Sequence, residues 1–532
     1  MSPAVLQRLG LASLLWTLLL VLTLFNRGLM PIDETRYVSV AWEMWVNHHW
    51  LVPLENGLPY SDKPPLLFWL MHAGWALFGV SDWWPRMVAP LFALGSLWLL
   101  PPIGRLLWGA DGAGTGASAA LLVSAGLLWC VFASATMFDM LLVFFALLGL
   151  FGVLLAWRSS RVFGFGLLAL AIGLGVLAKG PVILLHTLPA ALLAPWWMRE
   201  QRPAKWWPWY LGVLAAVLGG AVIALAWALP AAAAGGEEYA NAILWGQTAG
   251  RVAHSFAHRR PFWWYVPLLP LVLLPLSLWG GFWRGLAAVW RQRDSAGVRF
   301  CLAWFLPAFV LLSLISGKQL HYLLPILPAL ALLVGRVTSG VVGAPPRYWW
   351  VAAGSVAIAV ALLIAPNFAR YHSEPWWLAD IGQVGAWLLL GWALLLLGLA
   401  QRVRLGPEAV LAVTAALWLL AIHLSLIAVA REAYDLRPVG RFLGGLEKAG
   451  IEIAHAGGYA DQYQFAGRLQ RPLEIVNDSP GGIAQWLDQH PEGAVVHYQH
   501  EWRLRLRQQF AYAQPYRGGA LLISLGARAA AR

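Results

Sequence analysis

Apolar runs of about 20 residues recur along most of this chain of 532 residues, with short loops between them. An α-helix needs roughly that many apolar residues to cross the hydrocarbon core of a membrane. Only 12% of the residues are charged, whereas a soluble protein carries roughly a quarter. The sequence therefore predicts an all-α polytopic membrane domain.

The apolar runs predict thirteen spans. The first, Leu11–Leu29, is long and lacks the small-residue cleavage site of a signal peptide, so we interpret it as a retained helix. The other twelve are expected at residues 86–107, 114–132, 139–157, 162–179, 180–198, 208–230, 263–283, 300–316, 319–339, 350–366, 383–401 and 408–430.

The apolar segment Pro64–Val80 is short for a span and contains His72, so it is expected to be a juxtamembrane or re-entrant helix. With that assignment, most basic loop residues from Arg8 onward fall on one side of the membrane. The positive-inside rule makes that side cytoplasmic. The net charge of +12 then indicates orientation rather than nucleic-acid binding. Cys130 and Cys301 fall near opposite faces, so we do not expect a disulfide between them.

The composition changes after residue 430. Acidic residues become frequent, and the short runs "IEIAHA", "PLEIV", "AVVHY" and "ALLISL" alternate with helical patterns. Strands alternating with helices are typical of an α/β fold. We therefore expect a transmembrane domain at 1–430 and a small α/β domain at 431–532 on the outer side.

Ionisable groups from separate segments gather on the outer face in this topology. They lie in the loop 30–82, at the outer ends of spans, in the loop 231–262 and in the junction "SGKQLHYLLP" that holds Lys318, His321 and Tyr322. Such groups are costly near a membrane unless they are paired, hydrated or functional. Their convergence favours a reaction site at this face.

Transfer from an anionic lipid donor fits these residue types. Lysine and arginine stabilise a phosphate in a site of low dielectric constant, and a carboxylate orients or deprotonates an acceptor. Asp33 and Asp139 are the candidate carboxylates. The candidate phosphate-binding groups are Lys63, Lys179, Arg259, Lys318 and the hydroxyls of Tyr60 and Tyr322.

Structural alternatives apply to several of these residues. Asp139 is placed to cap a helix, and Lys179 and Lys318 are placed to extend toward the interface. Glu34 is spaced to form an ion pair with Arg36.

His254 and His258 are spaced as metal ligands on one helix face. Loop histidines without a carboxylate partner are more often not ligands.

The motifs that carry these residues resemble a known family. "DETRYVSVAWEM", "NGLPYSDKPPLLFW", "ATMFDMLL", "LAKGPV", "HRRPFWWY" and "SGKQLHYLLP" occur in this order. They are similar to the lipid A aminoarabinose transferases and the related protein O-mannosyltransferases. The resemblance implies a GT-C glycosyltransferase with outer-face juxtamembrane helices, which uses a sugar carried on undecaprenyl or another polyprenyl phosphate.

The resemblance also implies roles for individual positions. Asp33 and Asp139 match the catalytic aspartates, and Arg36 is expected to orient the first-loop acid. Arg36 and Glu34 are also candidates for the substrate- and phosphate-binding site. The positions that match the groups holding the carrier phosphate are Tyr60, Lys63, Lys179, Arg259 and Tyr322. Asp62 stands where the family often has Glu; with an outer-loop histidine it forms the candidate metal site. No cofactor is otherwise expected.

The implied reaction is an inverting displacement in which polyprenyl phosphate leaves the anomeric carbon. The implied acceptor is lipid A, at the periplasmic face of the inner membrane of a two-membrane bacterium. A protein, O-antigen or another envelope glycan remains an alternative acceptor. A lipid-linked sugar flippase is a further alternative, but it predicts ionisable groups near the middle of the membrane.

Overall fold

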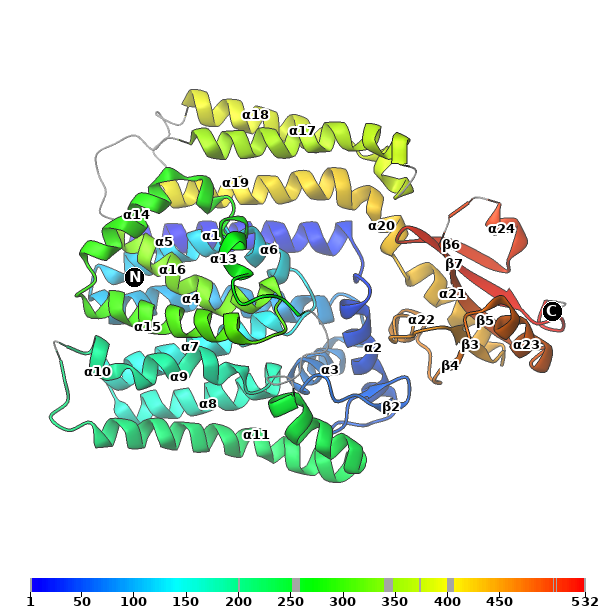
Figure 1. The fold of residues 1–532 in the computed structure, drawn as a ribbon, viewed down its shortest axis with the longest axis horizontal. Coiled ribbons are helices and arrows are strands. Elements are labelled where there is room, and N and C mark those ends of the chain that lie inside the picture. The colour runs from blue at the N-terminus through cyan, green and yellow to red at the C-terminus, as the bar shows by residue number, and fades with distance from the viewer. Residues whose placement is uncertain are drawn as a thin grey trace.

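The fold is that of a computed structural model. It describes residues 2–199, 201–250, 259–338, 348–372, 375–399, 406–500, 502–503 and 505–530. Long helices with roughly aligned axes form one body, and a small sheet domain lies beyond one end of that body (Figure 1).

Nine helical stretches in the described residues are long and apolar enough to cross a membrane. They cover Pro3–Asn26 (α1), Pro85–Trp108 (α4), Asp139–Arg158 (α7), Arg161–Lys179 (α8), Trp207–Gly246 (which includes α11, Trp207–Asn241), Ala296–Leu314 (α15), Leu320–Val337 (which includes most of α16, Leu327–Thr338), Trp349–Ala369 (in α17, Trp349–His372) and Pro407–Lys448 (which begins with α19, Pro407–Ile422). The chain is a multi-pass membrane protein.

A tenth span is broken. Helices α5 (Gly112–Ser124) and α6 (Leu127–Ala133) pass the length and composition test together, but they are bent by 79°. Gly126 lies at the break with an extended backbone. This pair corresponds to the predicted span 114–132.

Shorter helices occupy the remaining three predicted spans. They are α9 (Val182–Leu192) with α10 (Ala194–Trp197), α13 (Tyr265–Val272) with α14 (Gly280–Arg291), and α18 (Val384–Leu399). Proline removes a backbone donor and interrupts helices, and Pro275 stands between α13 and α14. For these three segments, crossing of the membrane stays a prediction, and so does the total of thirteen spans.

Apolar side chains cover the outside of the bundle. Leu14, Leu18 and Phe25 of α1 expose 54%, 54% and 85% of their surface. A soluble protein rarely exposes a continuous apolar face of this kind, whereas lipid chains solvate it. By contrast, 72% of the apolar window of α7 is buried, against 22% for α1. Helix α7 is therefore central and α1 is peripheral.

Helices α7 and α8 pack backbone to backbone through glycines. A Cβ on Gly164 would lie 2.3 Å from the backbone nitrogen of Ala156, and one on Gly152 would lie 2.7 Å from the carbonyl oxygen of Gly164. Small residues let membrane helices approach this closely. Because the two helices are antiparallel, the contact brings Asp139 at the start of α7 beside Lys179 at the end of α8.

The predicted outer loop 30–82 folds into short elements at one end of the bundle (Figure 1). They are α2 (Asp33–Val46), the hairpin of β1 (Leu54–Glu55) and β2 (Leu58–Pro59), and α3 (Leu66–Phe78). Asn56 and Gly57 form the hairpin turn with positive φ angles of 51° and 80°, as an Asn-Gly hairpin favours. Helix α3 is the expected short helix of Pro64–Val80.

The C-terminal region forms the expected α/β fold. Its helices are α20 (Ala428–Tyr434), α21 (Arg437–Lys448), α22 (Gln464–Gly467), α23 (Pro480–Gln489) and α24 (Leu506–Gln509). Its strands are β3 (Ile453–Ala456), β4 (Glu474–Val476), β5 (Ala494–Gln499), β6 (Tyr512–Tyr516) and β7 (Gly519–Leu525). The sheet order is β4-β3-β5-β7-β6. β3 runs parallel to β4 and β5, whereas β7 runs antiparallel to β5 and β6.

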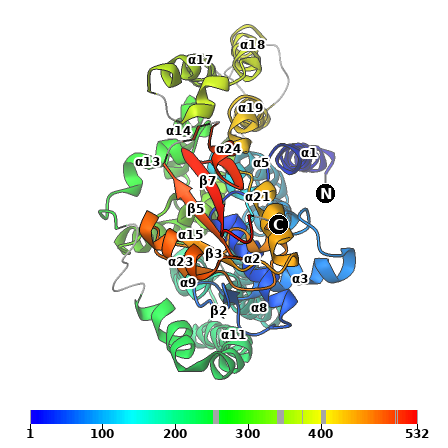
Figure 2. The same ribbon diagram turned by 90° about the vertical axis from the view of Figure 1, so that its right-hand side faces the viewer.

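This C-terminal sheet domain lies against the outer-loop elements rather than the far end of the bundle (Figures 1 and 2). The indole of Trp42 in α2 donates a hydrogen bond to the carbonyl of Leu469 over 2.8 Å. The backbone N–H of Phe465 donates to the hydroxyl of Ser39 over 3.1 Å. The first loop and the last domain therefore share one face of the protein.

Candidate active site

Helix α2 begins with two acids that have different surroundings. Glu34 is buried and accepts two hydrogen bonds from the guanidinium of Arg27, at 2.7 and 2.9 Å. It also accepts from the backbone N–H groups of Met30 and Thr136. The prediction that Glu34 pairs with Arg36 or binds the carrier phosphate is corrected: its oxygens are occupied by Arg27 and by backbone donors. No motif in the sequence pointed to Arg27 as this partner.

Asp33 is exposed at the first position of α2. Within the described part of the chain, its carboxylate accepts no hydrogen bond and forms no ion pair. The N-terminal end of a helix dipole stabilises the negative charge there. This aspartate is therefore accessible and uncommitted, as a reacting or orienting carboxylate has to be.

Arg36 follows this acid by about one helical turn in α2 and belongs to a polar cluster. Its Nε is 3.4 Å from Oε1 of Glu55, which is its carboxylate partner. Burial alone would lower the pKa of Arg36, but the charge of Glu55 and the contact with Tyr60 raise it above its ordinary value. Burial raises the pKa of Tyr60, and the charge of Asp62 raises it further. The phenol of Tyr60 is thus a proton donor.

Lys63 lies over an aromatic ring that joins two parts of the site. Its Nζ is 5.9 Å from the ring centroid of Tyr37 in α2. The Tyr37 ring packs edge-on against Phe138, with centroids 5.0 Å apart, and Phe138 precedes Asp139. Burial, followed by the charge of Asp33, raises the pKa of Tyr37. The predicted groups Asp33, Lys63 and Asp139 are therefore brought to one place.

Asp139 and Lys179 form an ion pair. Nζ of Lys179 donates to Oδ1 of Asp139 over 2.5 Å, and Nε2 of His321 lies 3.8 Å from the same oxygen. The ammonium of Lys179 is also 5.3 Å from the ring centroid of Tyr322. Three predicted residues thus meet here, and His321 joins them. Asp139 holds Lys179 rather than only capping its own helix.

Lys318 and Arg259 lie where two outer segments meet. Residues 259 and 317 form an antiparallel bridge. The ammonium of Lys318 is buried and donates to the carbonyl oxygens of Arg260 and Ile315, at 3.0 and 2.5 Å. Two of the three donors of its ammonium are thus taken by backbone carbonyls, and phosphate binding by Lys318 stays a prediction. Arg259 is exposed, as an anion-binding residue requires.

The metal prediction has little support in the described residues. Asp62 is exposed, and no group of three or more His, Cys, Asp or Glu residues in the described ranges is arranged to hold a metal ion. His254 and His258 lie outside the described residues. Cys130 and Cys301 are both free and buried, as expected.

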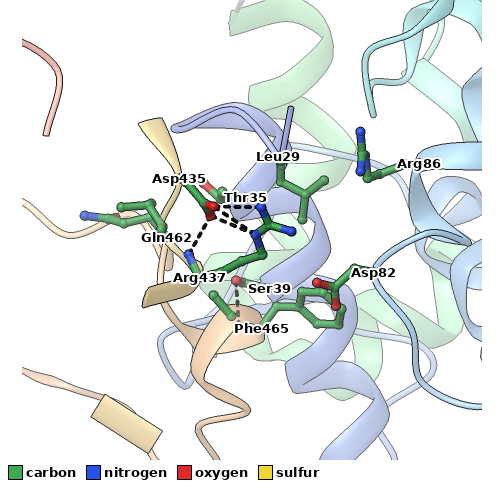
Figure 3. Close-up of a pocket in the computed structure, with 12 residues that line it drawn as sticks. Leu29, Thr35, Ser39, Asp82, Arg86, Asp435, Arg437, Gln462 and Phe465 are labelled. Atoms are coloured by element: carbon green, nitrogen blue, oxygen red, sulfur yellow. Dashed lines mark hydrogen bonds and ion pairs between the residues drawn. The ribbon is translucent and has the colours of Figure 1, made fainter. Parts of the chain in front are cut away.

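A small cavity of about 30 Å³ lies between α2 and the C-terminal domain. Figure 3 shows Thr35 and Ser39 on one side of it and Asp435 and Arg437 on the other. This volume admits a water molecule but no sugar or lipid. The cavity therefore marks a domain contact and not the substrate site.

A second contact between the outer loop and the C-terminal domain buries two acids. The backbone N–H of Asn56 donates both to Glu43 of α2, over 3.0 Å, and to Asp461 of the domain, over 2.8 Å. Burial and the neighbouring carboxylate raise the pKa of Asp461 to about 9, and burial raises that of Glu43. One proton is therefore retained by the pair at neutral pH.

Comparison with known proteins identifies the family. A profile described as dolichyl-phosphate-mannose-protein mannosyltransferase matches residues 62–227. An undecaprenyl phosphate-alpha-4-amino-4-deoxy-L-arabinose arabinosyl transferase of Erwinia tasmaniensis is 30% identical over 404 residues, which cover 72% of this chain and 70% of the relative. The chain belongs to this arabinosyl transferase family.

Other relatives agree over a shorter length. A Pseudomonas aeruginosa protein of the same name is 33% identical over 335 residues, which cover 60% of this chain and 59% of that protein. The chain thus spans about three-fifths of that relative's length.

The crystal structure of ArnT from Cupriavidus metallidurans in the apo state matches 99% of this chain and 98% of its own, with a TM-score of 0.76 and 20% identity. The structure of the same protein bound to undecaprenyl phosphate matches with a TM-score of 0.68. At this identity the two structures show a common fold.

Proposed function

We propose that this protein is a glycosyltransferase that moves a sugar from undecaprenyl phosphate to a phosphate of lipid A. The sugar is 4-amino-4-deoxy-L-arabinose or a close relative of it. The family members named above supply the donor and sugar class. The lipid A acceptor and the periplasmic orientation rest on the resemblance and on the distribution of basic loops in the sequence.

One observation supports the reaction most directly. An exposed and uncommitted aspartate, Asp33, shares a site with the cations Lys63 and Lys179, although the three come from distant parts of the chain. Cations beside a carboxylate are what a phosphate leaving group and an acceptor require. The groups lie at one end of the helical bundle, where a carrier phosphate in the lipid headgroup region is accessible.

The proposed step is a direct displacement at the anomeric carbon. An oxygen of the acceptor phosphate attacks that carbon, and the bond from the carbon to the carrier phosphate oxygen breaks. The electron pair of the broken bond stays on undecaprenyl phosphate, which leaves as an anion. Attack from the opposite side inverts the configuration. No proton has to be removed, because a phosphate acceptor is already anionic near neutral pH.

The residues have separate roles in this step. Lys63 and Arg259 stabilise the charge on the leaving phosphate, and Tyr60 donates a hydrogen bond to it. Lys179 does the same while Asp139 holds its ammonium in position. Asp33 orients the sugar or the acceptor, and Arg36, held by Glu55, shapes the loop around it. No step passes through a metal ion.

A conservative substitution of Asp33 tests the function. Cells that lack the protein are complemented with wild type, with Asp33→Asn or with Asp488→Asn, an exposed acid in the C-terminal domain that serves as control. We expect mass spectrometry to detect lipid A carrying one added aminopentose with wild type and Asp488→Asn. Asp33→Asn should reduce that species about 100-fold, the loss expected when the reacting groups are misplaced by about 1 Å.

Two outcomes contradict parts of this proposal. If lipid A is unchanged and a sugar is missing from another envelope glycan or protein, the proposed acceptor is wrong and the proposed donor still stands. Full activity of Asp33→Asn at equal membrane levels would remove Asp33 from the reaction. Turnover by purified protein in detergent, where no sealed compartment exists, separates a transferase from a flippase.

A further inference from the structure

A groove lies between the last turn of α1 and the C-terminal domain, and none of the residues given a role in the reaction above lines it. It encloses about 730 Å³. One wall is the last turn of α1 and the residues after it, and the other comes from the α20–α21 junction, Arg507 and β6. A volume of this size accommodates a sugar headgroup with its phosphate.

The charged residues of the groove favour an anion. Four arginines line it, against two acids: Arg27, Arg431, Arg437 and Arg507 face Glu432 and Asp435. Arg437 is neutralised by Asp435 through a fork of hydrogen bonds between 2.7 and 3.1 Å (Figure 3). Arg431 and Arg507 are exposed, and within the described residues neither makes an ion pair with a carboxylate. Two guanidinium groups thus remain available for a ligand.

The other part of the groove is apolar. Leu24 and Phe25 belong to the last turns of α1, and the side chain of Phe25 is 85% exposed. Pro438 and Pro515 add apolar surface on the domain side. Because α1 is a membrane-spanning helix, this end of the groove opens at the lipid boundary. An occupant with both a negative charge and an acyl chain satisfies both parts.

Hydrogen bonds fix the domain wall in place. The amide of Gln514 in β6 donates to the carbonyl of Asp435, and its oxygen accepts from the backbone N–H of Val439 and from the hydroxyl of Tyr512. The backbone N–H of Arg517 donates to the carbonyl of Ala433 over 2.7 Å. These hydrogen bonds tie β6 to the α20–α21 junction and so hold together the domain wall of the groove.

The groove is adjacent to the catalytic loop. Arg27 lines it and also holds Glu34, the residue after Asp33, in the bidentate contact described above. The same guanidinium donates to the carbonyl of Ser134, in the segment that leads to Asp139. Arg27 therefore connects the groove to the start of α2, which carries Asp33, and to the segment that precedes Asp139.

We propose that this groove binds the phosphorylated headgroup of the acceptor lipid, with Arg431 and Arg507 on a phosphate other than the one that attacks the sugar. This inference rests on the proposed function, because it assigns the acceptor site of that reaction. The carrier lipid is not the occupant, since its phosphate belongs with Lys63 and Lys179.

The test uses full-length protein in detergent and two readouts. Binding of bis-phosphorylated lipid A is measured without donor, and its apparent KM is measured with donor. The double variant Arg431→Ala/Arg507→Ala should weaken binding and raise that KM roughly tenfold, because charge-assisted bonds to phosphate are lost. Arg505→Ala, which removes a neighbouring exposed arginine outside the groove, should change neither.

Two internal comparisons sharpen the result. Dephosphorylated lipid A should bind wild type and the double variant equally. The affinity for undecaprenyl phosphate should be unchanged in the double variant. Equal binding of bis-phosphorylated lipid A by wild type and double variant would overturn the acceptor groove. Absence of transfer by wild type, with the difference in binding preserved, would instead overturn the proposed reaction.

Discussion

At the scale of single residues, the structure separates adjacent acids into different roles. Glu34 and Asp33 are neighbours in the chain, but Glu34 is buried against Arg27, while Asp33 is exposed. Removing one partner of a buried ion pair leaves an uncompensated charge, which is strongly destabilising. The side chains of Arg27 and Glu34 are 9% and 6% exposed. Glu34 is therefore a structural residue that positions the start of α2.

This assignment predicts that Glu34→Gln lowers stability. The free energy of unfolding should fall by about 3 kcal/mol, as for other broken buried pairs. The affinity for undecaprenyl phosphate should not change, since the oxygens of Glu34 are occupied by Arg27 and by backbone donors. Thermal unfolding in detergent and a lipid-binding titration measure the two quantities. The control is Glu55→Gln, because Glu55 is a partly exposed partner of Arg36 and should cost less than about 1 kcal/mol. A stable Glu34→Gln protein with weakened carrier binding would restore the phosphate-binding role.

At the scale of elements, glycine contacts decide where catalytic groups meet. Helices α7 and α8 approach so closely that Gly164 has no room for a Cβ, since the backbone of Ala156 and Gly152 lies within 2.5 Å of that position. Gly166, on the same helix, has nothing within 4 Å. The contact sets the relative position of the two helices that carry Asp139 and Lys179.

The pair of glycines gives a matched test. Gly164→Ala should force the helices apart and destabilise the protein by about 1 to 3 kcal/mol. Turnover should fall with it, because the separation of Asp139 and Lys179 increases. Gly166→Ala should be neutral or slightly stabilising, since alanine is favoured over glycine in helices. Thermal unfolding and turnover of the purified variants check this, and equal behaviour of the two variants would contradict the packing argument.

At the scale of the whole molecule, the C-terminal domain is joined to the active-site loop by the acids Glu43 and Asp461. The folded-state pKa of Asp461, about 9, lies above the ordinary value of about 4. An acid with a raised folded pKa contributes stability below its unfolded pKa and loses that contribution as pH rises toward the folded value. The contact between the C-terminal domain and the active-site loop should therefore weaken as the pH increases from about 4 to 9.

Asp461→Asn should remove this pH dependence. An amide at that position still donates to Glu43 but cannot become charged. At pH 9 the variant should be more stable than wild type by about 1 to 3 kcal/mol, the range for relieving one buried unpaired group. Hydrogen exchange of the Asn56–Gly57 turn, followed between pH 5 and 9, measures the docking. Asp488→Asn is the control, and a wild-type turn whose protection is constant with pH would refute the role of this pair.

Much of the fold follows from local patterns. Apolar length predicted the long helices, Asn56 and Gly57 form a hairpin turn that their residue types favour, and alternating strands predicted the C-terminal sheet. The predicted span 263–283 is less regular than expected, because Pro275 interrupts it. For the site, the motifs predicted Asp33, Asp139, Lys63 and Lys179. They did not predict that Arg27 is the partner of Glu34, nor that Lys318 donates to backbone carbonyls.

The sequence by itself determined that the chain crosses a membrane many times and that its ionisable groups collect at one face. Those conclusions depend on hydrophobic length and on charge next to each span, which are local and additive along the chain. Only the tertiary structure decided which acid is paired, which lysine is taken by backbone carbonyls, and that the last domain covers the first loop. Partner choice depends on distances between segments hundreds of residues apart, and these are set by packing, such as the glycine contact of α7 and α8.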